Sequence, residues 1–349
     1  MTSHRPNATN PRLPTLWQRF SARWLRVALG TALSLLFLWL AFRDVPLADV
    51  LSVFQRARYR FVAVALGLVL VSPLLRAARW RLLFHPDQHG LGLPRLSELL
   101  LIGQMLNILV PARLGELARI YLMGQLEGRS RARTLGTIAV EKALDALMLF
   151  LLALLIPLFV TLPTWFRDAR LSLAGLVLAL FAVTLLLAHQ QAWVVGIVGR
   201  LSRILPGNWQ ERVEQAAGHA LCRLDVLRDV SVNLRLQAWS LTVLLNSMLT
   251  NYAIFRALGM ELSFAAALFL LAVLEVGVAV PSAPGKLGVF HYLCVLALGV
   301  FGVAKEPAIA YAVLLHVIAF LPPSLLGALF LWWESVHGHR MPARLENEA

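Results

Sequence analysis

The sequence predicts an all-α integral membrane protein with about six full spans and two broken, re-entrant helix pairs. Of its 349 residues, 59% are hydrophobic and 15% are charged. Long uncharged runs occupy residues 146–166, 171–188, 236–255 and 307–333. Each is long enough, or nearly so, to cross about 30 Å of hydrocarbon as a helix.

The charge distribution predicts the orientation. The formal net charge is +13, which the positive-inside bias and anionic lipid head groups explain better than nucleic acid does. The first 26 residues contain five arginines and no acid, so we expect residues 1–23 to form a cytoplasmic tail. These features predict a multi-pass protein of the inner (cytoplasmic) membrane with a cytoplasmic N-terminus.

In the first half, we expect crossings at 24–43 and 60–84, joined by an interfacial amphipathic helix at 47–58. Residues 97–125 are ambiguous, because their uncharged part is too short for an easy span and Pro111 and Gly115 interrupt it. A re-entrant pair is favoured, since it places the basic loop 129–133 on the side of the N-terminus.

The remaining crossings follow along the chain. Crossings are expected at 134–163, 171–189, 236–257 and 307–333, with a second broken segment at 263–303. An Arg-rich amphipathic segment, 190–235, joins the halves 24–189 and 236–335 on the cytoplasmic side, and 336–349 form a short polar tail. If the broken segments are counted as spans, the chain has eight or nine hydrophobic segments. Broken segments at corresponding places in two halves indicate an inverted repeat with a binding site near the bilayer midplane.

The first broken segment carries the first candidate cluster. Arg113, Glu116 and Arg119 share one helical face after Asn107 and Pro111. Because charges inside a bilayer are costly unless they are paired or hydrated, these residues are expected to face a cavity or each other. Arg113 or Arg119 then meets a lipid phosphate, or the arginines form a structural pair with Glu116. Gly115 permits a close backbone approach.

A second cluster contains Glu141, Lys142 and Asp145. Glu141 and Asp145 share a helix face, so they are expected to pair with Arg113 or Arg119, to act in gating or proton coupling, or to form a solvated helix start. Arg76 and Arg79 either reach lipid head groups or line the substrate path.

The third cluster lies in the second broken segment. Glu275 is isolated in an otherwise uncharged run, which makes it a functional candidate. Pro281 and the Pro284-Gly285 turn are expected to aim a helix that begins at about Lys286 into the membrane, where its N-terminus would bind an anion. Gly288 is a further structural break. His291 and His316 are expected to be hydrogen-bonded packing residues.

These residues support a resemblance to the flippase-like membrane family that includes the transmembrane domain of lysylphosphatidylglycerol synthases. The resemblance covers roughly residues 25–335. The pieces that carry it are Arg79-Trp80 with Leu82-Leu83, Asn107-x-x-x-Pro111-x-Arg113-x-Gly115-Glu116-x-x-Arg119, Glu141-Lys142-x-x-Asp145 and Pro281-x-x-Pro284-Gly285-x-x-Gly288. The family usually has Pro-Gly-Gly where this chain has Pro284-Gly285-Lys286, and often Glu where it has Phe290-His291.

The resemblance implies lipid translocation without lipid synthesis, because the soluble aminoacyltransferase domain of the two-domain relatives is not expected in this chain. The implied partner is a membrane lipid with an anionic phosphate head group, a phospholipid or a polyisoprenyl phosphate. Envelope-lipid biosynthetic enzymes are further expected partners.

Two alternatives remain open at this point. One is a membrane transferase acting on a lipid-linked substrate, with Glu116 or Asp145 as general base. The other is a non-transporting scaffold of an envelope-lipid pathway. The sequence contains no P-loop, no nucleophile elbow and no metal-ligand spacing around Cys222 or Cys294. We therefore expect no enzyme activity, cofactor or metal.

Overall fold

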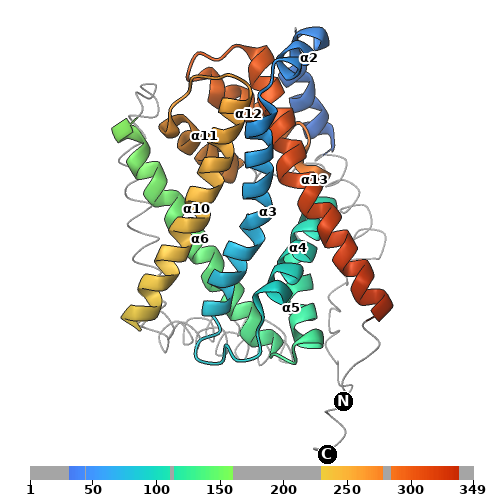
Figure 1. Cartoon of the computed structure of the whole chain (residues 1–349), viewed down its shortest axis with the longest axis vertical. Helices are drawn as coiled ribbons and strands as arrows, with labels where there is room; N and C mark the ends of the chain where they lie inside the picture. Colours follow the sequence, from blue (N-terminus) through green and yellow to red (C-terminus); the bar gives the residue numbers. More distant parts are fainter. Residues whose placement is uncertain (1–30, 44, 111–113, 160–228, 278–283, 338–349) are drawn as a thin grey trace, which may run out of the picture.

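The computed structural model describes residues 31–43, 45–110, 114–159, 229–277 and 284–337. Within these ranges all regular structure is helical, and the helices run mainly along the long axis of one bundle (Figure 1). After a helix at Thr31–Phe42, the elements are α2 (Leu47–Gln55), α3 (Tyr59–Leu82), α4 (Leu93–Leu109), α5 (Gly115–Leu126), α6 (Arg131–Phe159), α10 (Val230–Ala257), α11 (Phe264–Gly277), the 3-10 turn η2 (Pro284–Lys286), α12 (Val289–Gly299) and α13 (Lys305–His337).

Four long helices form the frame of the bundle. Among the described helices, α3 and α13 are both long and apolar enough to cross a membrane. The helices α6 and α10 contain 29 and 28 residues, which at 1.5 Å per residue exceeds the thickness of the hydrocarbon core. Within the described residues these helices occupy the expected crossings at 60–84, 134–163, 236–257 and 307–333, as far as Leu82 in the first and Phe159 in the second.

The start of α10 is capped by Asp229, which accepts hydrogen bonds from the backbone N–H groups of Ser231 and Val232. Hydrogen bonds to Ser231, and then to Val232, hold the pKa of Asp229 below its ordinary value. At its other end α10 meets the start of α3, where the Arg58 N–H donates to the Ala257 carbonyl at 2.7 Å. The two helices therefore pack along each other from end to end.

The first broken segment returns to the end of the bundle from which it came. α4 and α5 are separated by residues 110–114 and pack against each other. Arg95 at the start of α4 pairs with Glu127 just after α5 at 3.1 Å. In addition, Arg133 in the first turn of α6 pairs at 2.5 Å with Asp87 in the loop before α4. The two helices therefore form the hairpin that a re-entrant path requires.

The second broken segment enters from the opposite end. α11 follows the end of α10, and α12 leads back to the start of α13. The start of α13 lies beside α2, because Val50 packs against Ile309 and Ala310. At its far end α13 reaches Arg95 through Glu334. Thus α13 runs the length of the bundle, from the α2 end to the α4–α5 end.

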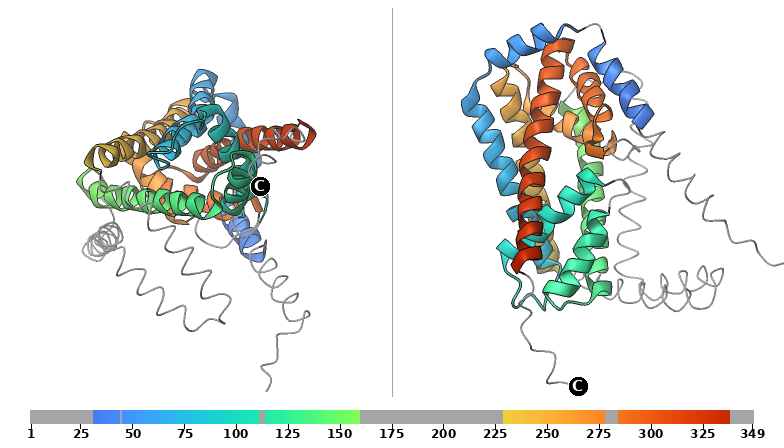
Figure 2. Two further views of the ribbon diagram at one scale, coloured as in Figure 1. Left: turned by 90° about the horizontal axis from the view of Figure 1, so that it is seen from below. Right: turned by 90° about the vertical axis from the view of Figure 1, so that its right-hand side faces the viewer.

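The helices α3–α6 and α10–α13 therefore form two units of an inverted repeat. The contact between α4 and α13 has its counterpart between α11 and α6, and the contact between α3 and α4 has its counterpart between α10 and α11. Figure 2 shows that the two re-entrant pairs lie at opposite ends of the bundle. The inverted repeat expected from the two broken segments is present in the described residues.

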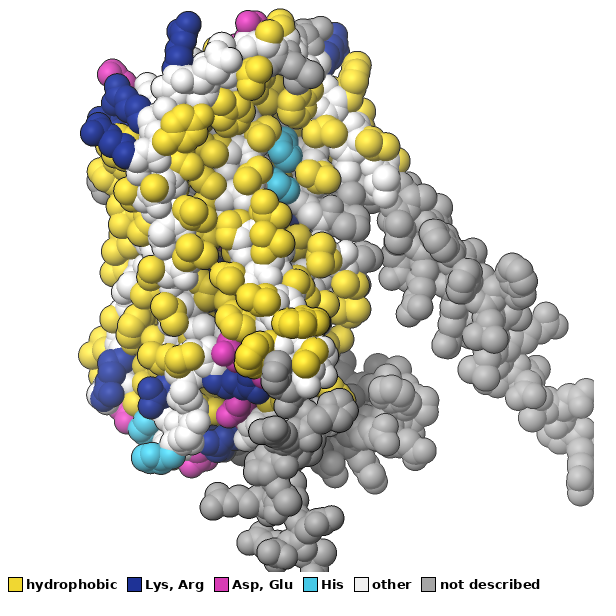
Figure 3. All heavy atoms as spheres, turned by 45° about the vertical axis from the view of Figure 1, so that its right-hand side comes forward, with side chains coloured by type: hydrophobic (Ala, Val, Ile, Leu, Met, Phe, Trp, Pro, Cys, Tyr) yellow, Lys and Arg dark blue, Asp and Glu magenta, His cyan; other side chains and the backbone are white. Residues whose placement is uncertain are grey.

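Apolar side chains cover the middle of the bundle, and charged side chains gather toward its two ends (Figure 3). Exposed large hydrophobic residues of α3, α10 and α13 include Leu70, Leu74, Leu245, Leu321 and Leu325. A soluble protein would bury such a surface, whereas a lipid bilayer solvates it.

Several expectations fall outside the described residues. They concern the crossing at 171–189, most of the amphipathic segment 190–235, both chain ends and the residues Pro111, Arg113 and Pro281.

Candidate functional site

Two adjoining cavities of about 360 and 340 Å³ lie between the two halves of the repeat. Their walls come from α3, α4, α5, α6, α10, α11 and the η2 turn, and the larger cavity also reaches α12 and α13. The residues that line both are Arg76, Asn107, Glu116, Lys142, Ser247, Leu271, Glu275 and Lys286. The cavities thus form one space, lined by both polar and apolar side chains, inside an apolar bundle.

The predicted binding residues converge on this space. Every one of them within the described ranges lines one or both cavities: Arg76, Arg79, Asn107, Glu116, Arg119, Glu141, Lys142, Asp145, Glu275 and Lys286. They come from both halves of the repeat, so it is the fold that brings these side chains close to one another. Arg113 lies outside the described residues.

Two buried arginines hold the cavity wall through ion pairs. Arg79 donates to Asp145 at 2.6 Å and lies 4.0 Å from Glu141. Arg119 donates to the two carboxylate oxygens of Glu141 at 2.7 and 3.3 Å. Arg79, Arg119 and Glu141 are 1%, 5% and 4% exposed. These contacts tie α3 and α5 to neighbouring turns of α6.

Trp80 completes this network. Its indole N–H donates to Thr137 at 3.0 Å, and the Arg119 guanidinium lies 4.1 Å from the centre of its ring. Arg79 also donates to Ser240 of α10. Four helices are therefore held together at one buried cluster of charges.

These pairs revise two expectations. The interpretation of Arg79 as a residue that reaches out to head groups is wrong, because Arg79 is buried and paired with Asp145. Arg119 forms the expected pair across helices with Glu141, and both of its terminal nitrogens are used there. A structural role for Arg119 therefore fits better than the role of phosphate ligand.

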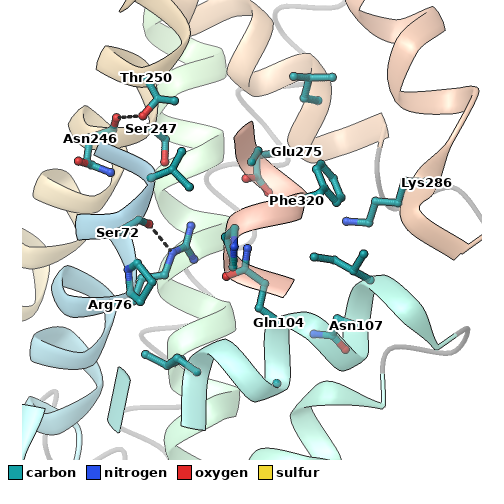
Figure 4. Close-up of a pocket in the computed structure, with 18 of the residues that line it drawn as sticks. Ser72, Arg76, Gln104, Asn107, Asn246, Ser247, Thr250, Glu275, Lys286 and Phe320 are labelled. Carbon is teal, nitrogen blue, oxygen red and sulfur yellow. Dashed lines mark hydrogen bonds between the residues drawn. The ribbon is translucent and has the colours of Figure 1, made fainter. Parts of the chain in front are cut away.

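Arg76 has a different environment. Its Nε donates to Ser72 at 3.4 Å, and no carboxylate lies within 4.0 Å of it in the described part of the chain. Figure 4 shows Arg76 and Lys286 projecting into the cavity from opposite walls. Arg76 can therefore offer its guanidinium to a ligand without first breaking an ion pair.

Three further charged residues face the cavities. Lys142 lies 3.7 Å from Glu116 and is exposed to the cavity. Lys286 lies over the ring of Phe320 at 5.8 Å. Glu275 is exposed and faces the same space (Figure 4). Acidic and basic groups thus both face the same space.

The break between α4 and α5 depends on a close helix contact. A Cβ atom on Gly115 would lie 1.9 Å from the Gly103 carbonyl oxygen. Asn107 accepts a hydrogen bond from the Gly115 N–H at 2.7 Å, which satisfies a donor at the start of α5. The expected role of Gly115 in a close backbone approach is confirmed.

The second break has unusual backbone geometry. Gly285, Lys286 and Gly288 have φ values of 73°, 57° and 83°. A Cβ atom on Gly288 would lie 2.0 Å from the Ser34 carbonyl oxygen, so glycine is required there. The expectation that the next helix begins at about Lys286 is wrong, because Lys286 ends the η2 turn and α12 begins at Val289. The reason is the left-handed conformation of Lys286, which cannot continue into a right-handed helix.

Sequence reasoning missed the uncharged polar lining. Ser72, Gln104, Asn246, Ser247, Thr250 and Asn251 all face the larger cavity. On α10, residues 247, 250 and 251 recur at helical spacing within an apolar run. That spacing is the signal by which this polar stripe could have been found.

His291 and His316 pack together behind the cavity wall. Their ring centres are 5.0 Å apart, and His316 stacks on Phe320 at 4.4 Å. Their role in packing is confirmed. The hydrogen bonds expected for them are not seen at either Nδ1 atom among the described residues.

The comparison with known families agrees with this architecture. The lysylphosphatidylglycerol synthase transmembrane region matches residues 27–327. The chain belongs to this family. It is also similar to a UPF0104 membrane protein of Methanothermobacter thermautotrophicus, with 25% identity over 77% of this chain and 83% of the relative. A UPF0104 membrane protein of Pyrococcus horikoshii is 23% identical over 88% of this chain and 96% of the relative.

The membership identifies an all-helical membrane protein of the lysylphosphatidylglycerol synthase transmembrane type. Both relatives match over most of their own length. The matched residues include α3 to α12 and most of α13, so they contain both re-entrant pairs and the cavity between them.

Proposed function

We propose that this member of the family moves a phospholipid or a polyisoprenyl-phosphate lipid across the cytoplasmic membrane. The observation that carries the proposal is a polar cavity with a cation, Arg76, that has no carboxylate partner among the described residues. The head group occupies the cavity, while the acyl or prenyl tail stays in the bilayer. We propose a transporter rather than an enzyme, with a cytoplasmic N-terminus.

The physical problem in such transport is the charge of the phosphate. A buried charge without partners costs far more free energy than a protein can easily supply. The cavity supplies guanidinium, ammonium, amide and hydroxyl groups in place of water. A phosphate therefore finds hydrogen-bond donors at the depth where the bilayer alone offers none.

The two sets of charges have different parts in this mechanism. The Arg79–Asp145 and Arg119–Glu141 pairs keep α3, α5 and α6 at fixed positions around the cavity. Arg76 holds the phosphate by a charge-assisted hydrogen bond, and Lys286 approaches from the other half of the repeat. Glu116 and Glu275 balance the basic charge.

The test is transbilayer movement of labelled lipids in liposomes that contain the purified protein. We expect Arg76→Gln to slow movement of an anionic lipid roughly tenfold or more, because a hydrogen bond to a charged group is worth about 1.5–3 kcal/mol. The variant should fold normally, since Arg76 has no ion pair to lose in the described part of the chain.

Arg131→Gln is the matched control, because Arg131 is exposed at one end of the bundle and contacts Tyr121 rather than the cavity. The control should move lipid at the rate of the unmodified protein. A folded Arg76→Gln protein that transports at the normal rate would remove Arg76 from the site. Absence of movement by the unmodified protein, for both anionic and neutral lipids, would argue against translocation itself.

A further inference from the structure

Arginines lie at both ends of the bundle. At the end formed by the 83–92 loop and the α5–α6 turn, Arg95 and Arg133 pair with acids of the same chain, whereas Arg131 lies over the ring of Tyr121 and Arg235 donates to Ser231. The pairs are Arg95 with Glu98, Glu127 and Glu334, and Arg133 with Asp87. Arg129 at this end donates to the His89 carbonyl.

The opposite end has four arginines without such pairs. Arg56 follows α2, Arg58 and Arg60 lie at the start of α3, and Arg256 is in the last turn of α10. The hydrogen bond from Arg58 to Ala257 brings these three helix ends together. Within the described ranges no carboxylate lies within 4.0 Å of any of the four. We call this group the arginine patch.

The helix dipole favours Arg56 and Arg256, which lie at helix C-termini, but stability of the fold does not explain Arg58 and Arg60. A cation at a helix N-terminus is disfavoured by the helix dipole, yet Arg58 and Arg60 flank the start of α3, whose first turn has no acid. Arg56, Arg58 and Arg60 are exposed, so they contribute little packing. In the orientation proposed above, this end faces away from the cytoplasm, where the positive-inside rule favours few arginines.

The neighbours of the patch indicate its surroundings. Leu51 and Tyr59 are 58% and 65% exposed beside it, although both are apolar or amphipathic. α2, which carries Leu51, caps this end of the bundle (Figure 1). Exposed Leu and Tyr beside Arg are typical of a membrane interface, where apolar groups meet the acyl region and cations meet the phosphates. An acidic soluble protein would leave these apolar groups unexplained.

We propose that the arginine patch binds the phosphate groups of anionic phospholipids at this surface of the membrane. The guanidinium fork matches phosphate oxygens, and a cluster of basic residues favours anionic over zwitterionic head groups. This site is separate from the cavity and does not depend on the transport function proposed for it.

The arginine patch lies close to the cavity along α10. Arg256 lies on α10, which also contributes Thr250 and Asn251 to the cavity wall. At 1.5 Å per residue, Arg256 lies about 7.5–9 Å along the helix from these two positions. Anionic lipids held by the patch are therefore concentrated beside the helices that line the polar space.

The experiment measures which lipids the purified full-length protein retains. Protein equilibrated with an equal mixture of phosphatidylglycerol and phosphatidylcholine is analysed by native mass spectrometry. We expect preferential retention of phosphatidylglycerol by the unmodified protein. The variant Arg56→Gln/Arg58→Gln/Arg60→Gln should lower the ratio of phosphatidylglycerol to phosphatidylcholine by at least about fivefold, since each basic residue at a membrane surface contributes to attraction of anionic lipid.

The matched control is Arg129→Gln/Arg131→Gln/Arg235→Gln, which removes the same charge outside the patch. It should keep the ratio of the unmodified protein. An unchanged ratio in the patch variant, or an equal loss in the control, would overturn the proposal. If the triple variant does not fold, the exposed single change Arg56→Gln is compared with Arg131→Gln by the same criterion. Since retention is measured without transport, the result stands whether or not the cavity moves lipid.

Discussion

At the scale of single residues, Glu141 joins the two buried arginines. It accepts hydrogen bonds from Arg119 at 2.7 and 3.3 Å and lies 4.0 Å from Arg79. We expect Glu141→Gln to lower the free energy of unfolding by about 3–5 kcal/mol, because removal of one partner leaves a buried charge uncompensated. Thermal unfolding of the purified protein in detergent measures this loss as a lower melting temperature.

Glu98→Gln provides the comparison for that prediction. Glu98 pairs with Arg95 at 2.8 Å, but both side chains are 28% exposed, and Arg95 keeps Glu127 and Glu334. Its loss should cost about 1 kcal/mol or less. Equal melting temperatures for the two variants would show that the Glu141 network does not stabilise the fold.

At the scale of elements, the contact between α4 and α5 sets the shape of the first break. Gly115→Ala places a Cβ atom 1.9 Å from the Gly103 carbonyl oxygen. The helices must separate, which we expect to cost at least about 1–3 kcal/mol and to lower transport, since Asn107 and Glu116 next to the contact line the cavity. Melting temperature and lipid movement in liposomes measure the two effects.

Gly67→Ala is the matched substitution, because a Cβ atom on Gly67 of α3 would have nothing within 4 Å. Alanine favours a helix over glycine, so this variant should be at least as stable as the unmodified protein. If Gly115→Ala behaves like Gly67→Ala, the close approach of α4 and α5 is not required.

At the scale of the whole molecule, the inverted repeat predicts which loops share a side of the membrane. Ion pairs join the loops before α4 and after α5, so His89→Cys and Ser130→Cys should react with a membrane-impermeant maleimide from the same side. Glu261→Cys and Lys305→Cys, which flank α11 and α12, should react from the other side. The background carries Cys222→Ser, while Cys294 is 0% exposed. Labelling in intact cells and in inverted vesicles gives the two sides.

A different labelling pattern would contradict the re-entrant arrangement. If α4 and α5 crossed the membrane as one span, Ser130→Cys and His89→Cys would be labelled from opposite sides. The same reasoning applies to Glu261→Cys and Lys305→Cys for the second re-entrant pair.

The sequence by itself determined the class of protein and the positions of its breaks. Apolar runs fix where helices can lie in a bilayer, and Pro and Gly mark where they stop, because both effects depend on local composition. Charge inside such runs is costly wherever the fold places it. For this reason Glu275 could be selected as a site residue before any contact was known.

The tertiary structure alone decided which charges pair and which face the cavity. Arg76 and Arg79 are three residues apart on one helix, yet Arg79 is paired with Asp145 while Arg76 contacts Ser72. The polar stripe of α10 and the end of η2 at Lys286 likewise depend on neighbouring helices. Pairing requires distances between residues remote in sequence, and helix packing sets those distances. Local composition contains no information about them.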